Sequence, residues 1–64
     1  MYEKILNEIV IVRLKEPNHA GRDSFSARFT DYSNGKLEFE NKNGVFWVVD
    51  EQSIDSVIAL RNRR

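Results

Sequence analysis

The chain of 64 residues contains no cysteine and a single histidine, His19. The lack of cysteine excludes disulfides and most zinc sites, and one histidine cannot build a multi-histidine metal site. A chain of about 60 residues buries only about 60% of its unfolded surface, so it is marginally stable without an added constraint. Oligomerisation is the remaining common way to stabilise so small a domain. We therefore expect a homo-oligomer, with a well-packed monomer as the alternative.

Long apolar runs and an excess of charge are also missing. No apolar run approaches the roughly 20 residues of a transmembrane helix, and no signal-peptide pattern opens the chain. We therefore expect a soluble, cytoplasmic protein with no membrane partner. Ten basic and ten acidic side chains give a formal net charge of 0, which is not typical of a nucleic-acid-binding protein. The charge is uneven, because residues 61–64 form a basic tail on a mildly acidic body.

Residues that usually perform catalysis are sparse. The serines have only His19 as a possible base, and nothing in the sequence places an acidic residue to orient it. No Gly-rich phosphate-binding loop is present. We therefore predict a protein that is not an enzyme, with no catalytic residue, cofactor, metal or small-molecule substrate.

The middle of the chain has a strong β-pattern. Period-two alternation between Gly-containing turns predicts a meander over residues 24–50. Its strands are expected at residues 24–32, 36–42 and 44–50, and the residues expected to face inward are Phe25, Ala27, Phe29, Leu37 and Phe39. Residues 45–49 are apolar at every position, so both faces of the last strand need cover.

The segments before and after the meander predict a short helix and two more strands. Apolar residues at helical spacing in residues 1–8 predict one or two turns of helix, which either plug one end of the fold or bind a partner. Residues 9–15 form a β-branched strand with Val10, Val12 and Leu14 on one face.

Residues 50–53 form a polar corner and residues 54–60 the last strand, although a helix over residues 51–60 is the alternative. Alternation in this strand puts Ile54, Ser56, Ile58 and Leu60 on one face, and Asp55, Val57 and Ala59 on the other.

A short helix followed by five tightly connected antiparallel strands is the order typical of a small SH3-like barrel, whose closure removes exposed edges. The run from Phe25 to Leu60 resembles the Sm/LSm (Sm-like) family. The segment ARFTDYSN at 27–34 matches the pattern of that family's second strand and turn, and LEFEN at 37–41 matches its third strand. Residues 45–49 and 50–58 match its fourth strand, closing turn and fifth strand. We therefore predict a mainly β fold, a single domain over residues 1–64 that forms a five-stranded SH3-like (Sm-like) barrel with a short N-terminal helix.

The resemblance implies assembly. Sm-like proteins form rings in which the fourth strand of one subunit pairs with the fifth strand of the next. The residues expected at such an interface are Phe46, Val48, Val57 and Ala59. In the alternative, the N-terminal helix covers this surface in a monomer.

The resemblance also implies single-stranded RNA as a partner. In this hypothesis Tyr32 stacks on a base, Asn34 contacts a base edge, and the tail residues Arg61, Arg63 and Arg64 contact phosphate.

A second hypothesis is a protein-interaction or assembly module with no nucleic-acid role. The family has basic residues in the turn before the last strand, whereas this chain has Asp50 and Glu51. Each close pair of like charges costs about 1 kcal/mol even in high dielectric. The two carboxylates would repel phosphate, which favours the second hypothesis.

Overall fold

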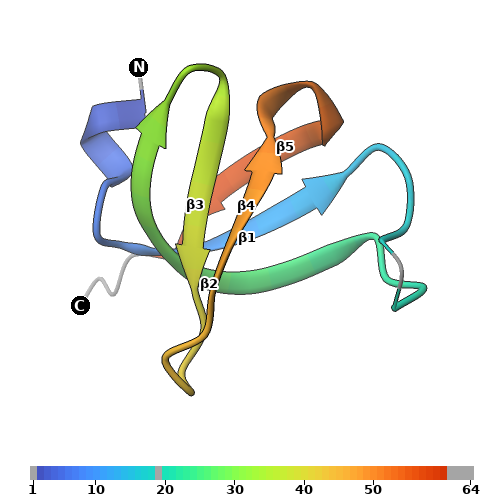
Figure 1. The fold of residues 1–64 in the computed structure, drawn as a ribbon, viewed down its shortest axis with the longest axis horizontal. Helices are drawn as coiled ribbons and strands as arrows, with labels where there is room; N and C mark the ends of the chain where they lie inside the picture. The colour runs from blue at the N-terminus through green and yellow to red at the C-terminus, as the bar shows by residue number, and fades with distance from the viewer. Residues whose placement is uncertain (1, 19, 61–64) are drawn as a thin grey trace.

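Residues 2–18 and 20–60 are described by a computed structural model, in which they form one antiparallel five-stranded sheet with the order β4-β3-β2-β1-β5 (Figure 1). The strands are β1 (Ile9–Leu14), β2 (Ser24–Ser33), β3 (Lys36–Glu40), β4 (Phe46–Asp50) and β5 (Ile54–Ala59). A 3₁₀ turn η1 (Tyr2–Ile5) precedes β1, and a second one, η2 (Glu51–Ser53), connects β4 to β5. The prediction of five antiparallel strands is confirmed, and the alternative helix over 51–60 is wrong.

Asparagine and glycine form both turns of the meander. Asn34 and Gly35 have φ angles of 53° and 74°, as the two-residue type I′ hairpin turn between β2 and β3 requires. In the next turn the Asn41 side-chain oxygen accepts the N–H groups of Asn43 (2.8 Å) and Val45 (3.0 Å). This Asx turn occupies backbone groups that would otherwise extend the ladder. Strands β3 and β4 are therefore shorter than predicted.

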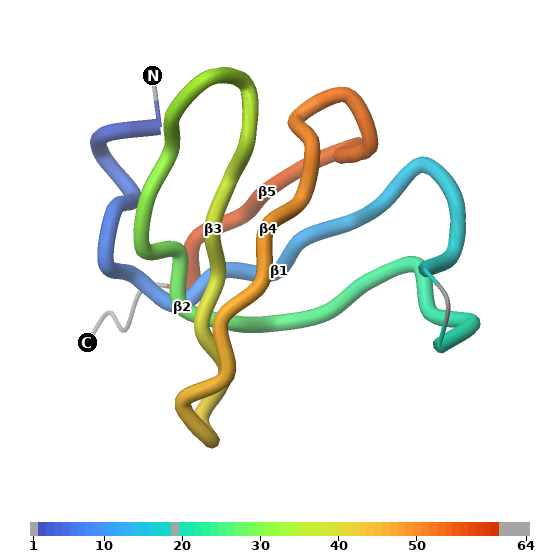
Figure 2. Tube along the Cα trace, in the orientation of Figure 1, coloured from blue at the N-terminus to red at the C-terminus, as the bar shows by residue number. Residues whose placement is uncertain are grey.

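Strand β2 is bent, and the bend gives the sheet its curvature. Its pairing with β3 shifts register between Phe29 and Asp31, so Thr30 is an extra residue in the ladder. Such bulges bend a strand and increase its twist. The Thr30 hydroxyl donates to the Glu38 carboxylate at 2.7 Å, which holds the bulge against β3. The first part of β2 therefore pairs with β1 and its last part with β3, as the trace in Figure 2 shows.

The core lies on the concave side of this curved sheet. Its buried residues come from the faces that the alternation predicted: Val10, Val12, Ala27, Phe29, Leu37, Phe39 and Ile54. Tyr2 and Ile5 of η1 pack against this cluster, so the N-terminal segment covers one end of the core. The segment is a single 3₁₀ turn rather than an α-helix. Asn7 adopts a φ of 68° directly after it and donates its N–H to the Phe29 carbonyl at 2.6 Å, which starts the β1 ladder.

The prediction of a closed barrel is wrong, because the sheet is open between β4 and β5 in the described part of the chain. All four observed strand pairs are antiparallel. Closing five strands in this order would therefore require β4 and β5 to pair in parallel. A parallel pair needs a connection of about a dozen residues or more. Only η2 connects these two strands, so each keeps one free edge.

We predict that Leu37→Ala lowers the free energy of unfolding by about 2–5 kcal/mol, because it leaves a cavity in the core. Leu37 is fully buried, whereas Leu6 is 37% exposed. Leu6→Ala is therefore the matched control and should have a clearly smaller effect. Urea unfolding followed by Trp47 fluorescence measures both. Equal losses in the two variants would contradict this description of the core.

Candidate interaction surfaces

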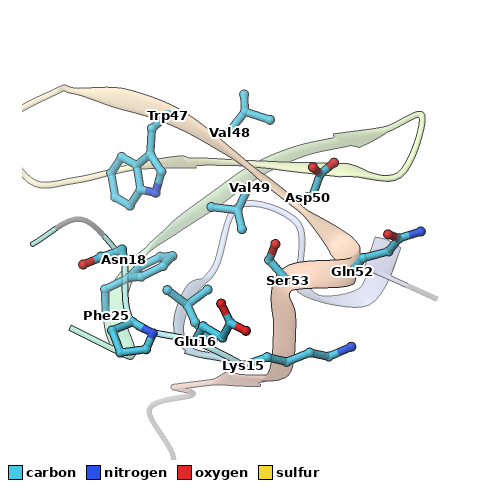
Figure 3. Close-up of a pocket in the computed structure, with 12 residues that line it drawn as sticks. Lys15, Glu16, Asn18, Phe25, Trp47, Val48, Val49, Asp50, Gln52 and Ser53 are labelled. Atoms are coloured by element: carbon cyan, nitrogen blue, oxygen red, sulfur yellow. The ribbon is translucent and has the colours of Figure 1, made fainter. Parts of the chain in front are cut away.

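A groove of about 870 Å³ lies at the open side of the sheet (Figure 3). Strand β4 and η2 form one wall, and the end of β1 with the following loop forms the other. Side chains of Trp47 and Val49 point into the groove, whereas Val48 points away from it. The remaining apolar lining comes from Leu14, Pro17 and Phe25.

The aromatic floor of the groove is continuous with the core. The ring of Trp47 packs on Phe25 at a centroid distance of 5.2 Å and an angle of 65°, and on Phe39 at 5.9 Å. Phe25 in turn packs edge-on against Phe39 at 5.2 Å. Such pairs contribute about 0.5–1.5 kcal/mol each beyond their buried area. Because Phe39 is fully buried, the floor is anchored to the core.

Hydrogen bonds from backbone N–H groups hold the loop wall of the groove. The Asn18 side-chain oxygen accepts the N–H groups of Ala20 (2.9 Å) and Arg22 (3.0 Å). Lys15 donates its N–H to the Ser53 carbonyl at 2.9 Å, which ties the loop to η2. The two walls are therefore linked to each other by a backbone hydrogen bond.

The backbone groups on the free edge of β4 belong to its outward-facing residues. Hydrogen-bonded pairs alternate along an antiparallel ladder. Glu51 donates its N–H to the Gly35 carbonyl at 2.8 Å, so in the β3–β4 register Val49 and Trp47 are the residues that bond to β3. The N–H and C=O groups that face away from the sheet are those of Phe46, Val48 and Asp50.

On the free edge of β4 the unpaired backbone groups belong to residues whose side chains face outward. On the free edge of β5 they belong to residues whose side chains face the core. Leu60 donates its N–H to the Ile9 carbonyl at 2.8 Å. Ile58 and Ser56 therefore bond to β1, in the observed register. The backbone groups that face away from the sheet belong to Val57 and Ala59, whose side chains pack against the core.

Both edge strands expose large apolar side chains. Phe46 and Val48 on β4 are 55% and 54% exposed, and Ile58 and Leu60 at the other end of the sheet are 54% and 50% exposed. These four residues are called the edge residues below. They lie at opposite ends of the strand order, one pair beside each free edge.

Alternation grouped Ile54 with Ile58 and Leu60 on one face of β5, whereas the structure buries Ile54 in the core and exposes the other two. Val57 and Ala59, expected at an interface, pack partly buried against the core, and Ile58 is exposed instead. The cause is a register shift in the β1–β5 ladder between Arg13 and Leu14. The shift makes Asp55 an extra residue, and one extra residue reverses the inward and outward positions that follow.

Tyr32 belongs to a cluster with Tyr2 and Glu51. The two rings pack at a centroid distance of 4.8 Å, and Tyr2 also packs edge-on against Phe29 at 5.8 Å. Both phenols donate to the Glu51 carboxylate, Tyr32 at 3.1 Å and Tyr2 at 3.3 Å. The cluster joins η1, the end of β2 and η2. Glu51 is therefore held by two donors, and the Tyr32 ring packs against Tyr2 at an interplanar angle of 50°.

The cluster also changes the acidity of both phenols. Burial, followed by the negative charge of Glu51, raises the pKa of Tyr2 above its ordinary value of 10.0. The hydrogen bond to Glu51 is the main cause that raises the pKa of Tyr32 above the same ordinary value. Each effect favours the protonated phenol that donates to the carboxylate.

Of the remaining RNA-binding candidates, Asn34 lies within the described residues. Asn34 is exposed in the β2–β3 turn, where its positive φ angle serves the turn. Arg61, Arg63 and Arg64 lie outside the described residues. Lys36 follows this turn, and its ammonium donates a hydrogen bond at 2.8 Å to the carboxylate of Asp50 on β4.

Sequence reasoning missed the groove and the role of Glu51. Phe25 was on an expected inward face and Trp47 in a strand whose two faces both need cover, but nothing local indicates that they line an open end of the core. Tyr2, Tyr32 and Glu51 are far apart in the sequence, and no motif connects them.

We predict that Glu51→Gln moves the titration of both phenols toward lower pH. Tyr2 and Tyr32 are the only tyrosines, so phenolate absorbance reports them alone, and Glu16→Gln serves as a control. Because folding raises these pKa values, the resulting stabilisation is complete below about pH 10, the ordinary pKa of tyrosine, and is lost as pH rises through the raised values. Identical titration curves for the wild type and Glu51→Gln would contradict the cluster.

Within residues 2–18 and 20–60, no group of three or more His, Cys, Asp or Glu side chains is placed to hold a metal ion. None of the helical segments in this part of the chain is long and apolar enough to cross a membrane. No family model, curated protein or solved structure matches this chain.

Proposed function

We propose that this protein is a non-catalytic assembly module whose copies join head to tail through the free edges of β4 and β5. The observation that supports the proposal is that both end strands combine an unpaired backbone edge with exposed apolar side chains. An unpaired edge is a template for another strand, and proteins that stay monomeric usually block it with lysine, proline or a covering segment. Neither β4 nor β5 contains a lysine or a proline.

Head-to-tail pairing follows from the two edges being different. A contact between unlike surfaces repeats from copy to copy and produces a closed ring or an open filament. In the Sm-like version of this proposal, the neighbouring copies complete the sheet that one chain leaves open. The gain in buried surface also addresses the marginal stability expected of 64 residues.

Single-stranded RNA has less support as a partner. The Tyr32 ring packs against Tyr2 at an interplanar angle of 50°, and its hydroxyl donates to Glu51. A phosphate near this surface would meet the carboxylates of Glu51 and Asp50. We therefore propose a module whose partners are protein chains, in the first place copies of itself.

Sedimentation velocity tests the proposal on the full chain. We expect the wild type to sediment as an oligomer and Val48→Lys to sediment as a monomer, because a lysine on the β4 edge disfavours strand addition. Leu6→Lys is the matched control, since Leu6 is exposed but lies on neither edge. A wild-type protein that stays monomeric at every concentration would reject the proposal.

A second measurement separates assembly from RNA binding. We expect labelled oligo-U and oligo-A to show no binding tighter than about 1 µM at low salt, in the range of non-specific electrostatic contact or weaker. Fluorescence anisotropy measures this directly. Tighter binding to one sequence, lost in Tyr32→Ala but kept in Tyr2→Phe, would instead support the RNA hypothesis.

A further inference from the structure

The outer side of the sheet carries an apolar patch across the β1–β5 ladder. Val10 of β1 is fully buried, so the alternation of the strand places Ile9 and Ile11 on the outer side. Residues directly opposite each other in a ladder share a face. Ile58 lies opposite Ile11, and Leu60, which donates its N–H to the Ile9 carbonyl at 2.8 Å, lies opposite Ile9. These four aliphatic residues are called the outer patch below.

The outer patch is open to solvent and lies partly in the middle of the sheet. Ile9 is 41% exposed and Ile58 54%, and Ile11 is half-buried at the centre of the patch. A strand added at either free edge extends the sheet, but it does not lie over β1, which already has β2 on one side and β5 on the other. Edge-to-edge assembly therefore leaves Ile9 and Ile11 uncovered, and another partner is needed to bury them.

The positions around the outer patch carry positive charge. Arg28 lies directly opposite Ile9, and Arg13 follows Ile11 on the same face of β1. Both arginines are exposed. The other outward positions beside the patch are serines, with no carboxylate among them: Ser24, Ser26 and Ser56. A partner for this surface therefore needs acidic groups next to its apolar ones.

A groove of about 530 Å³, called the side groove below, borders the outer patch beside Ile9. Arg28 and Lys42 line it together with Glu40, which is the single carboxylate among its lining residues. The Arg28 guanidinium donates one hydrogen bond, to the Asn7 carbonyl at 2.9 Å, and has further N–H groups that can donate to a carboxylate. The side groove is therefore a place where an acidic side chain of a partner can enter.

The spacing of the outer patch suits an α-helix lying along β1 and β5. Residues two apart in a strand are about 6.8 Å apart, and residues four apart in a helix are separated by a rise of about 6 Å. An apolar stripe at i, i+3, i+4 and i+7 can therefore cover both rows of the patch, and packing of a helix on a sheet is a common way to bury an apolar face. Nucleic acid suits this surface less well, because none of its outward residues is aromatic and able to stack on a base.

We propose that the outer patch docks an acidic amphipathic helix of another protein, which goes beyond the self-assembly proposed above. The apolar stripe of the helix covers the patch, and its carboxylates bind Arg13 and Arg28. The acidic residue nearest Arg28 enters the side groove, where Lys42 adds to the attraction. Charge-assisted hydrogen bonds between carboxylate and guanidinium are stronger than neutral ones, so charge selects the partner while apolar contact supplies most of the affinity.

Two synthetic helical peptides test the proposal on the full chain. Both carry the same leucine stripe, flanked by glutamates in one peptide and by lysines in the other. Fluorescence anisotropy of the labelled peptides measures binding. We expect the acidic peptide to bind in the micromolar range and the basic peptide to bind about tenfold more weakly or worse. Equal binding of the two peptides, or no binding of either up to about 1 mM, overturns the proposal.

Charge reversal of the arginines tests the selectivity. We expect Arg28→Glu to weaken binding of the acidic peptide about tenfold and to strengthen binding of the basic one. Arg13→Glu should act in the same direction without touching the Asn7 hydrogen bond, which guards against a folding defect. Arg22→Glu makes the same change of charge in the exposed loop and is the matched control, which should leave both affinities unchanged. Equal effects of the three substitutions overturn the proposal.

Chemical shifts of the backbone amides locate the bound peptide. We expect changes at Ile11 and Ile58, together with an unchanged Trp47 emission, because Trp47 points into the other groove (Figure 3). Changes centred on Trp47 would overturn the proposed site. Binding of the chain to anionic phospholipid vesicles or to oligo-U in place of the acidic peptide would overturn the proposed partner.

Val48→Lys separates this inference from the proposed self-assembly. Val48 lies on β4, outside the outer patch, so binding of the acidic peptide should persist in this variant when assembly is lost. A monomeric wild type that binds the acidic peptide rejects only the assembly, and an assembling wild type that does not bind it rejects only the docked helix. Loss of assembly in a folded Ile9→Lys variant would identify a second copy as the occupant of the patch and overturn the inference.

Discussion

The two outermost strands of this sheet, β4 and β5, each leave one row of backbone N–H and C=O groups without a partner in the sheet. The other features of the structure depend on these two free edges. Five strands joined by antiparallel pairs cannot close through the short η2 connection between β4 and β5. The bulge at Thr30 curves the sheet around its core without closing it. The open side exposes the groove, both free edges and the edge residues, which is why these features occur together.

The strands and turns could be predicted because their causes are local. Asn34-Gly35 specifies the hairpin turn by its positive φ angles, and alternation along β2 and β3 specifies which residues enter the core. The faces of β5 could not be predicted in the same way. They depend on one extra residue opposite the junction of Arg13 and Leu14, and the alternation of the strand itself contains no sign of that bulge.

The candidate site was less predictable, because it depends on contacts between distant parts of the chain. Asp50 and Glu51 were expected to repel phosphate, but the sequence did not indicate that Glu51 accepts hydrogen bonds from both tyrosines. Tyr32, the candidate for stacking on a base, packs against Tyr2. The apolar character of β4 did predict an uncovered surface, and Phe46 and Val48 are exposed as expected.

Amide hydrogen exchange at low and high protein concentration tests the central claim most directly. If β4 and β5 join between copies, the amides of Val48 and Ala59 gain protection as concentration rises, because each finds a partner across the junction. The Leu37 amide, which already bonds within the sheet, should show the same protection throughout. Exchange at Val48 and Ala59 that stays fast and independent of concentration would contradict the account.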